Sequence, residues 1–145
     1  MSVSVAKGRS NARKKALQAL YQWHMSGNDL AEIESQFHEE QNMDKVDLEY
    51  FHTLLHQVPA EVNGLDQLID QFSNRKDDEI DPIEQSVLRL ATYEIKHRID
   101  VPYKVVISEA ISLAKMFGSD KSHVFINSIL DKLAKQLRSH EVAMK

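Results

Sequence analysis

Residues 81–95 read DPIEQSVLRLATYEI, and this stretch decides the fold. Asp81 is suited to cap the N-terminus of a helix, and Pro82 suits the first helical position, where its missing N–H costs nothing. Glu84 stands where a side chain can reach back to the cap. Apolar residues then recur at helical spacing, namely Ile83, Val87, Leu88, Leu90, Ala91 and Ile95. The pattern predicts a helix from Pro82 onward with one buried face.

The rest of the chain favours helices as well. It has 145 residues with only four glycines and three prolines, and alternating β-branched runs are rare. A first helix is expected from Ser10 or Asn11 to about Met25, with Gly27 as its stop. Further helices are expected from residue 28 or 29, from residues 44–47 to Pro59, from 62 to about 73, from 102 or 104 to 118, and from 120 or 122 to 137.

A polar stretch, NRKDDEI at residues 74–80, divides these helices into two groups and is expected to be a linker. We therefore predict an all-α bundle of six or seven helices in two subdomains. The N-terminal half would span about residues 1–75 and the C-terminal half about residues 80–140. Together they would form a single domain over residues 1–145.

Composition and motifs exclude several classes of protein. The absence of cysteine rules out disulfides, thiolate metal sites and cysteine nucleophiles, and it favours a reducing compartment. No apolar run approaches the length of a membrane span, and the N-terminal segment MSVSVAKGRSNARKK lacks the apolar core of a signal peptide. A cytoplasmic protein without a membrane partner is expected. Phosphate-binding glycine loops, G-x-S-x-G and H-E-x-x-H are all absent, so we expect no enzymatic activity, no catalytic residue and no cofactor.

One group of residues has the spacing of metal ligands. Glu49, His52 and His56 would lie on one face of the third helix. Three such side chains can hold a metal ion. They also flank an apolar stripe, where a solvated polar edge is the simpler interpretation. Because neither a fourth ligand nor a supporting shell can be identified, we expect no metal site.

Charge is segregated along the chain. The net charge of −4 divides into +5 for residues 1–28, −12 for residues 29–100 and +3 for residues 101–145. Such a distribution indicates an anionic partner that contacts one part of the surface.

The basic N-terminal segment is the clearest functional signal in the composition. Its cations are Lys7, Arg9, Arg13, Lys14 and Lys15, with no acidic residue among them. On a helix Arg9 and Arg13 share a face. Five cations suit a short single-stranded nucleic acid whose bases stack on aromatic rings, for which Tyr21 and His24 are candidates. A solubilising basic tail is the alternative interpretation.

Several blocks of sequence together resemble one family. Residues 12–23, ARKKALQALYQW, resemble the R-x-x-A-x-Q-A-L-Y opening of the NusB family of bacterial transcription antitermination factors. The match continues with EQSVLRLATYE at residues 84–94 and DVPYKVVISEA at 100–110. It closes with AKMFG at 114–118, Ser122-His123, and FINSILDK at 125–132. The blocks occur in order over nearly the whole chain, which makes the combination specific.

The resemblance implies the all-α NusB fold and a role without catalysis. It also implies binding of the boxA element of nascent ribosomal RNA leaders, as a heterodimer with NusE, a small-subunit ribosomal protein. In the family this complex joins NusA and NusG on RNA polymerase, which then reads through terminators. The same partners are expected for this chain.

The resemblance further implies which residues bind RNA. The family's basic arm maps onto Arg9, Arg13 and Lys14, its aromatic neighbour maps onto Tyr21, and its Phe-Gly loop maps onto Phe117 and Gly118. The expected RNA-binding residues are Lys7, Arg9, Arg13, Lys14, Tyr21, Phe117, Lys121, Ser122, His123, Phe125 and Asn127. Glu84 and Lys104 lie in other matched blocks and are expected near RNA or NusE.

The sequence departs from the family pattern in two ways. Ser10 and Asn11 dilute the basic arm, which is expected to weaken RNA affinity. Lys121 stands where an acid is expected, and a cation there would add a phosphate contact.

Two other functions are compatible with a helical chain of this length. The NusB fold also resembles the N-terminal module of certain ribosomal RNA cytosine methyltransferases, but the sequence ends at Lys145 without a catalytic domain. The other alternative is a helical scaffold for protein interactions without a nucleic-acid role. The sequence leaves open the oligomeric state, the preferred RNA sequence and the face that meets NusE.

Overall fold

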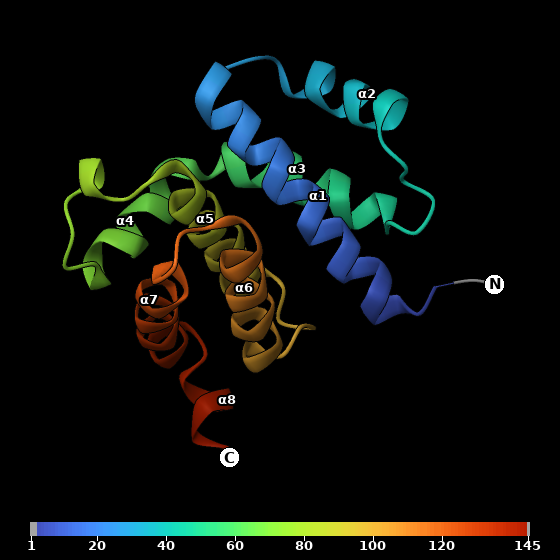
Figure 1. Cartoon of the computed structure of the whole chain (residues 1–145). Coiled ribbons are helices and arrows are strands. Elements are labelled where there is room, and N and C mark those ends of the chain that lie inside the picture. Colours follow the sequence, from blue (N-terminus) through green and yellow to red (C-terminus); the bar gives the residue numbers. More distant parts are fainter. Residues whose placement is uncertain (1–2, 145) are drawn as a thin grey trace. The chain divides into compact units, whose positions relative to one another are not determined.

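The computed structural model describes residues 3–144, which form eight α-helices and one short 3-10 helix without a strand among them (Figure 1). The prediction of an all-α fold is confirmed. The chain divides into two compact units, the first ending at Ala60 and the second beginning at Glu61.

The first unit contains three helices: α1 (Val5–Ser26), α2 (Leu30–Glu40) and α3 (Leu48–Ala60). Helix α1 packs on both α2 and α3, and Figure 1 shows it crossing α3. Each helix contributes an apolar face to the core, which includes the fully buried Leu17, Ile33, Phe51 and Leu54. This unit therefore presents the basic segment on a helix anchored by its apolar side.

Helix α1 begins earlier than expected. Ser4 is its N-cap and accepts a hydrogen bond from the backbone N–H of Lys7, so Ser10 and Asn11 lie within the helix instead of capping it. At the other end Gly27 adopts the left-handed conformation, with φ of 70°, and stops the helix as predicted. The early start makes the basic segment helical almost throughout.

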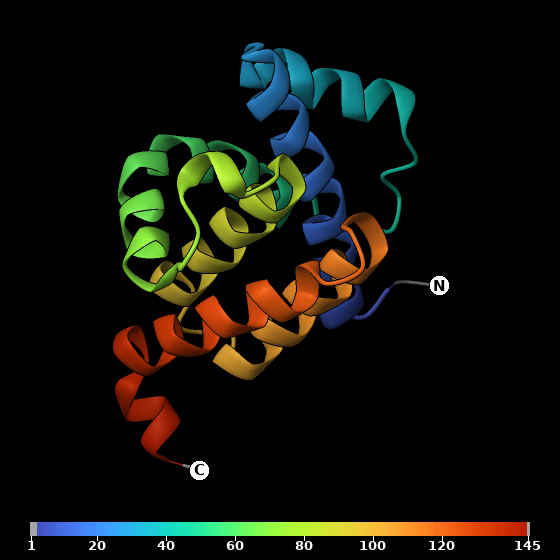
Figure 2. The same ribbon diagram turned by 60° about the vertical axis from the view of Figure 1, so that its left-hand side comes forward.

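The second unit contains α4 (Val62–Phe72), the 3-10 helix η1 (Asp77–Glu79), α5 (Pro82–His97), α6 (Tyr103–Phe117), α7 (Ser122–Leu137) and α8 (Ser139–Ala143). Helix α5 packs against α4, α6 and α7. Figure 2 shows α6 and α7 side by side, with α8 turning away at the end of α7. The short α8 was missed by the sequence prediction.

Helix α5 is the centre of this unit. The capping box between Asp81 and Glu84 is present as predicted. Burial extends much further round the helix than one apolar face, because Thr92, Tyr93 and Glu94 are buried together with the predicted apolar residues. Ile83, predicted to be buried, is only half-buried.

The boundary between the units differs from the expected division near residue 75. Pro59 lies one residue before the end of α3, where its missing N–H interrupts the helical ladder, and the chain resumes as α4 at Val62. Because α4 packs on α5 and α7, it belongs to the second unit. The polar stretch 74–80 is thus a connection inside that unit.

Arg138 ties the end of α7 to the end of α5. It is 6% exposed, and its guanidinium donates hydrogen bonds to the backbone carbonyls of Glu94, Ile95, Arg98 and Val101. Glu141 on α8 accepts from the same guanidinium and from the backbone N–H of Tyr103 at the start of α6, at 2.8 Å. Arg138 thus caps carbonyl groups at the end of α5, and Glu141 of α8 caps the backbone N–H at the start of α6.

None of the helices in the described part of the chain is long and apolar enough to cross a membrane.

Candidate nucleic-acid interface

The predicted RNA-binding residues fall into two groups, one in each unit. The first group lies on α1 and consists of Lys7, Arg9, Arg13, Lys14 and Tyr21. The second lies at the turn between α6 and α7 and on α7, and consists of Phe117, Lys121, Ser122, His123, Phe125 and Asn127.

On α1 the two arginines share a face and meet the same aromatic ring. The guanidinium carbon of Arg9 lies 4.6 Å from the ring centroid of Tyr50, and that of Arg13 lies 5.5 Å from it. Both distances are typical of cation–π contacts. Arg13 is only 3% exposed. Its guanidinium lies in the interior and packs toward Tyr50, and contact of Arg13 with RNA stays a prediction.

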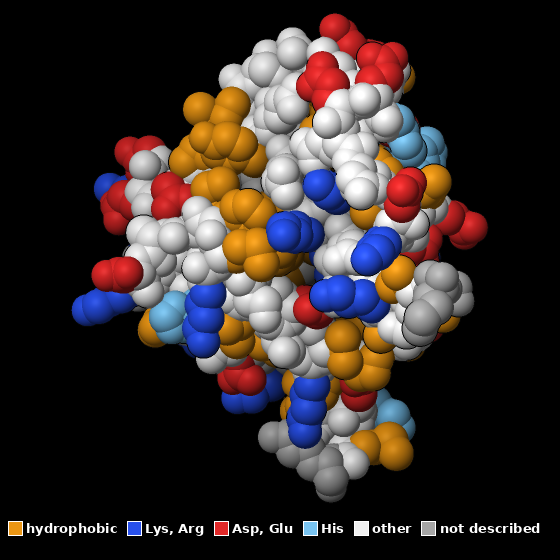
Figure 3. Space-filling view, turned by 45° about the vertical axis from the view of Figure 1, so that its right-hand side comes forward, with side chains coloured by type: hydrophobic (Ala, Val, Ile, Leu, Met, Phe, Trp, Pro, Cys, Tyr) orange, Lys and Arg blue, Asp and Glu red, His pale blue; other side chains and the backbone are white. Residues whose placement is uncertain are grey.

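The lysines of α1 are oriented differently. Lys7 and Lys14 are exposed, and Tyr21 is half-buried. Figure 3 shows a face of the molecule with exposed Lys and Arg side chains among uncharged and hydrophobic ones. The cations that can reach a polyanion from α1 are thus chiefly lysines.

A small hollow beside α1 is lined by three lysines, two of which lie on α1. It has a volume of about 180 Å³ and is lined by Asn11, Lys14, Lys15, Asn42, Lys45 and Val46, with no acid among its described lining residues. Asn11 donates to the backbone carbonyl of Lys45 at 2.9 Å, which holds the loop before α3 against α1. Lys15 donates to the side-chain oxygen of Gln41, and three lysines around one hollow suit an anion.

Lys45 and Asn42 were not among the predicted site residues. Sequence spacing could not reveal them, because they lie about thirty positions after Lys14 in a segment with net negative charge. The loop brings them to α1 only through tertiary packing.

In the second unit, Gly118 permits a tight turn between α6 and α7. A Cβ atom at this position would lie 2.7 Å from the carbonyl oxygen of Ala114 and 2.9 Å from the Cβ of Ser122. The close approach requires glycine. It sets Phe117 at the end of α6 and Lys121 just before α7.

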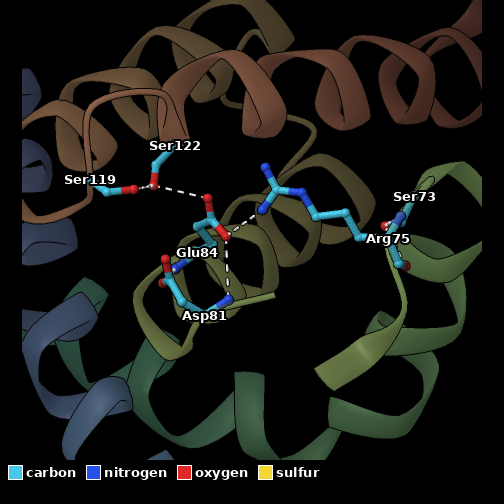
Figure 4. Close-up of polar contacts among 6 residues, drawn as sticks. All are labelled: Ser73, Arg75, Asp81, Glu84, Ser119 and Ser122. Carbon is cyan, nitrogen blue, oxygen red and sulfur yellow. Dashed lines mark hydrogen bonds and ion pairs between the residues drawn. The ribbon is translucent and has the colours of Figure 1, made fainter. Parts of the chain in front are cut away.

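Behind this turn lies a buried polar network centred on Glu84 (Figure 4). One oxygen of the Glu84 carboxylate accepts from the hydroxyl of Ser122 at 2.9 Å, and the other accepts from Arg75 at 2.9 Å and from the backbone N–H of Asp81 at 3.3 Å. The side chain of Glu84 is 4% exposed. Its charge is thus compensated by hydrogen bonds and by one guanidinium, as a buried carboxylate requires.

Arg75 extends this network to α7. Its guanidinium carbon lies 3.7 Å from the ring centroid of Phe125, while Ser73 accepts from its backbone N–H and donates to its carbonyl. The stretch 74–80, expected to be a linker, is therefore held against the start of α7 through Arg75. Arg75 was not predicted as a site residue, and no local motif marks it.

The residues of the second group differ in their exposure to solvent. Ser122 is 1% exposed and Phe125 is 9% exposed, so they support the turn from inside. Lys121 and Asn127 are exposed, and Phe117 and His123 are half-buried. Glu84, expected near RNA or NusE, lies in the interior, and its role toward a partner stays a prediction.

Lys104 and Asn127 line one open groove between α6 and α7. The groove has a volume of about 510 Å³, and its other walls include Tyr103, Ile107 and Asp131. Lys104, expected near RNA or a protein partner, is exposed at its edge. The structure thus places Lys104, expected near RNA or NusE, on the same groove as Asn127, expected at RNA.

Comparison with known proteins gives consistent results. The sequence profile of the NusB family matches residues 10–135. The protein named Transcription antitermination protein NusB from Saccharophagus degradans is 54% identical over 143 residues, which cover 98% of this chain and 95% of that protein. The protein of the same name from Teredinibacter turnerae is 49% identical over 142 residues, covering 97% and 96% of the two chains.

A comparison of folds also matches this chain to a NusB structure. A solved structure of T. maritima NusB superposes with a TM-score of 0.80 and covers 99% of both chains, at 26% sequence identity.

Proposed function

The chain belongs to the NusB family, and from this we infer that it acts as a transcription antitermination factor that binds RNA. The observation that carries the proposal is the high identity to relatives of that name over nearly their whole length. Such coverage leaves no large domain of those relatives without a counterpart here.

The specific partners are part of the proposal. The chain would bind the boxA element of ribosomal RNA leaders together with NusE, and with NusA and NusG it would support read-through by RNA polymerase. The charge distribution supports this division of partners. Residues 1–28 are basic and suit RNA, while residues 29–100 are strongly acidic and suit a basic ribosomal protein.

In the first unit, the exposed lysines would contact the phosphates. The hollow formed by Lys14, Lys15 and Lys45 offers three cations to one stretch of backbone, and Lys7 lies on the same helix. Tyr21, half-buried, keeps part of its ring available for stacking. Arg9 and Arg13 would act by holding this helix face on Tyr50.

In the second unit, the exposed edge of the turn would contact RNA. Lys121 supplies a cation, and the ring of His123 and that of Phe117 can meet a base. Ser122, Phe125 and Glu84 would fix the turn from behind.

Binding of this kind has a defined salt dependence. Neutralising three to five phosphates of a single strand gives a slope of log affinity against log salt of about −2 to −3.5. A slope near zero would show that the lysines do not hold the RNA.

A direct test is RNA binding with and without NusE. Fluorescence anisotropy of a labelled boxA oligonucleotide, titrated with the full chain, is expected to show weaker binding alone than with purified NusE. Equal affinity in both titrations would remove NusE from the proposal. Absence of binding in both would remove the RNA.

A further inference from the structure

A carboxylate and two imidazoles meet on the surface of the first unit, between α2 and α3. One oxygen of Glu34, on α2, lies 2.8 Å from Nδ1 of His52, and the other lies 2.8 Å from Nε2 of His56, both on α3. The rings of the two histidines lie 4.3 Å apart between centroids. The RNA-binding function proposed above uses none of these groups.

The positions of these three side chains suit a metal ion better than the spacing of residues along α3 alone predicted. The three ligand atoms all lie within 4.8 Å of one another. Two ligands of one tetrahedral zinc ion are about 3.3 Å apart, since each zinc–ligand bond is about 2.0 to 2.2 Å. Small side-chain rotations of the two histidines would therefore place all three atoms around one ion.

The chemistry of the donors is equally suited. Histidines at i and i+4 on a helix are a common pair of zinc ligands, and a carboxylate is a common third. Burial opposes ionisation of Glu34, but hydrogen bonds from His56 and His52 and their positive charge outweigh it and lower the pKa of the carboxyl. Glu34 is therefore a carboxylate near neutral pH, which is its ligating form.

The third ligand is not the one that the sequence indicated. Glu49 lies three residues before His52, but it is not part of this group of described residues. Glu34 comes from another helix, 18 residues before His52. Because Glu34 lies on a different helix, a search for ligands at helical spacing along one helix could not find it.

We propose that Glu34, His52 and His56 bind a divalent transition-metal ion of the zinc type and so clip α2 to α3. The side chain of Glu34 is 17% exposed, that of His56 27% and that of His52 59%, so an ion can enter from solvent. Water would complete the coordination. Each imidazole would bind the ion through the nitrogen that now faces Glu34, and that nitrogen first gives up its proton, so metal binding releases protons to solvent.

Calorimetric titration of the untagged, full-length chain with Zn²⁺ tests the proposal. One equivalent is expected to bind and to raise the melting temperature. The double variant His52→Gln/His56→Gln is expected to bind more than about tenfold more weakly, and Glu34→Gln to weaken binding as well. Mg²⁺, which prefers oxygen ligands, is expected not to compete.

Matched controls separate this site from other residues. His140→Gln removes an exposed histidine of the second unit, and Glu39→Gln removes an exposed acid of α2; both should bind Zn²⁺ like the wild type. An unchanged melting temperature of the wild type, or a double variant within twofold of wild-type affinity, would overturn the proposal.

A measurement on the wild type guards against variants that fail to fold. In NMR spectra of the histidine rings, Zn²⁺ should shift the signals of His52 and His56 and leave the other five histidines unchanged. Shifts confined to other histidines would overturn the proposal.

Discussion

At the scale of single residues, the structure separates cations that face solvent from cations that do not. Lys14 is exposed in the hollow with Lys15 and Lys45, whereas Arg13 is 3% exposed and packs toward Tyr50. Both stand in the same basic run of the sequence. Their expected roles in RNA binding are therefore different.

Lys14→Ala is expected to weaken RNA binding and to reduce the magnitude of the salt slope by about 0.7, because one phosphate contact is lost. Affinities measured at several salt concentrations give this slope. Lys132→Ala, which removes an exposed lysine of α7, is the control and should leave it unchanged. An unaltered slope in Lys14→Ala would exclude Lys14 from the RNA contact.

Arg13→Ala is expected to lower the free energy of unfolding by about 2 kcal/mol, because it removes buried packing and a cation–π contact with Tyr50. Urea unfolding followed by circular dichroism measures this loss. The salt slope of RNA binding by the folded variant should stay close to that of the wild type. If instead the magnitude of the salt slope fell by about 0.7 and the stability were unchanged, Arg13 would be assigned to the RNA contact.

At the scale of helices and turns, Gly118 is the most constrained position of the candidate interface. Gly118→Ala would drive a Cβ atom into the carbonyl of Ala114 and the side chain of Ser122. The turn must then move, at a cost of about 1–3 kcal/mol. Gly64→Ala is a matched control on α4, because nothing lies within 4 Å of its added Cβ, and it should not destabilise the protein.

Thermal or urea unfolding compares the two glycine variants. The account of the turn would be contradicted if Gly118→Ala were as stable as the wild type.

The contact between α8 and α6 predicts a pH effect. The hydrogen bond from the backbone N–H of Tyr103 is the main cause that lowers the pKa of Glu141 below its ordinary value of 4.5; burial opposes this, and Arg138 adds to it. A carboxyl with a lowered pKa stabilises the fold above its unfolded pKa and loses that contribution as pH falls through its folded pKa.

Glu141→Gln should therefore be less stable than the wild type at neutral pH, by about 1 kcal/mol or less, and the difference should shrink as the pH falls below the ordinary carboxyl pKa of 4.5. Urea unfolding at each pH gives the two curves. A difference that stays constant over this range would show that the charge of Glu141 contributes nothing.

The helices were largely predictable from sequence, because caps and apolar spacing are local. The capping box at Asp81 and the stop at Gly27 are both found as predicted. The misplaced start of α1 shows the limit, since Ser4, Ser10 and Asn11 all have side chains that can cap a helix. Only the packed structure decides among them.

The candidate interface was less predictable, because it depends on contacts between distant segments. The burial of Arg13 follows from Tyr50, and the burial of Glu84 follows from its contacts with Arg75 and Ser122. Lys45 and Glu34 became visible only when loops and helices packed together. Spacing indicates which side chains share a helix face, but it cannot tell which neighbour covers that face.

At the scale of the whole molecule, the net charge of −4 does not show how charge is distributed along the chain. The chain has a basic segment at residues 1–28 and an acidic segment at residues 29–100. A nucleic-acid contact is local, so a few grouped lysines can hold a strand although the protein as a whole is acidic.

The central claim is that this member of the NusB family recognises boxA RNA. The most direct test is competition between a boxA oligonucleotide and a scrambled oligonucleotide of the same composition, measured with the full chain and purified NusE at one salt concentration. The boxA oligonucleotide is expected to bind at least about tenfold more tightly, since base contacts distinguish it where phosphate contacts cannot. Equal affinity for the two oligonucleotides would contradict the claim.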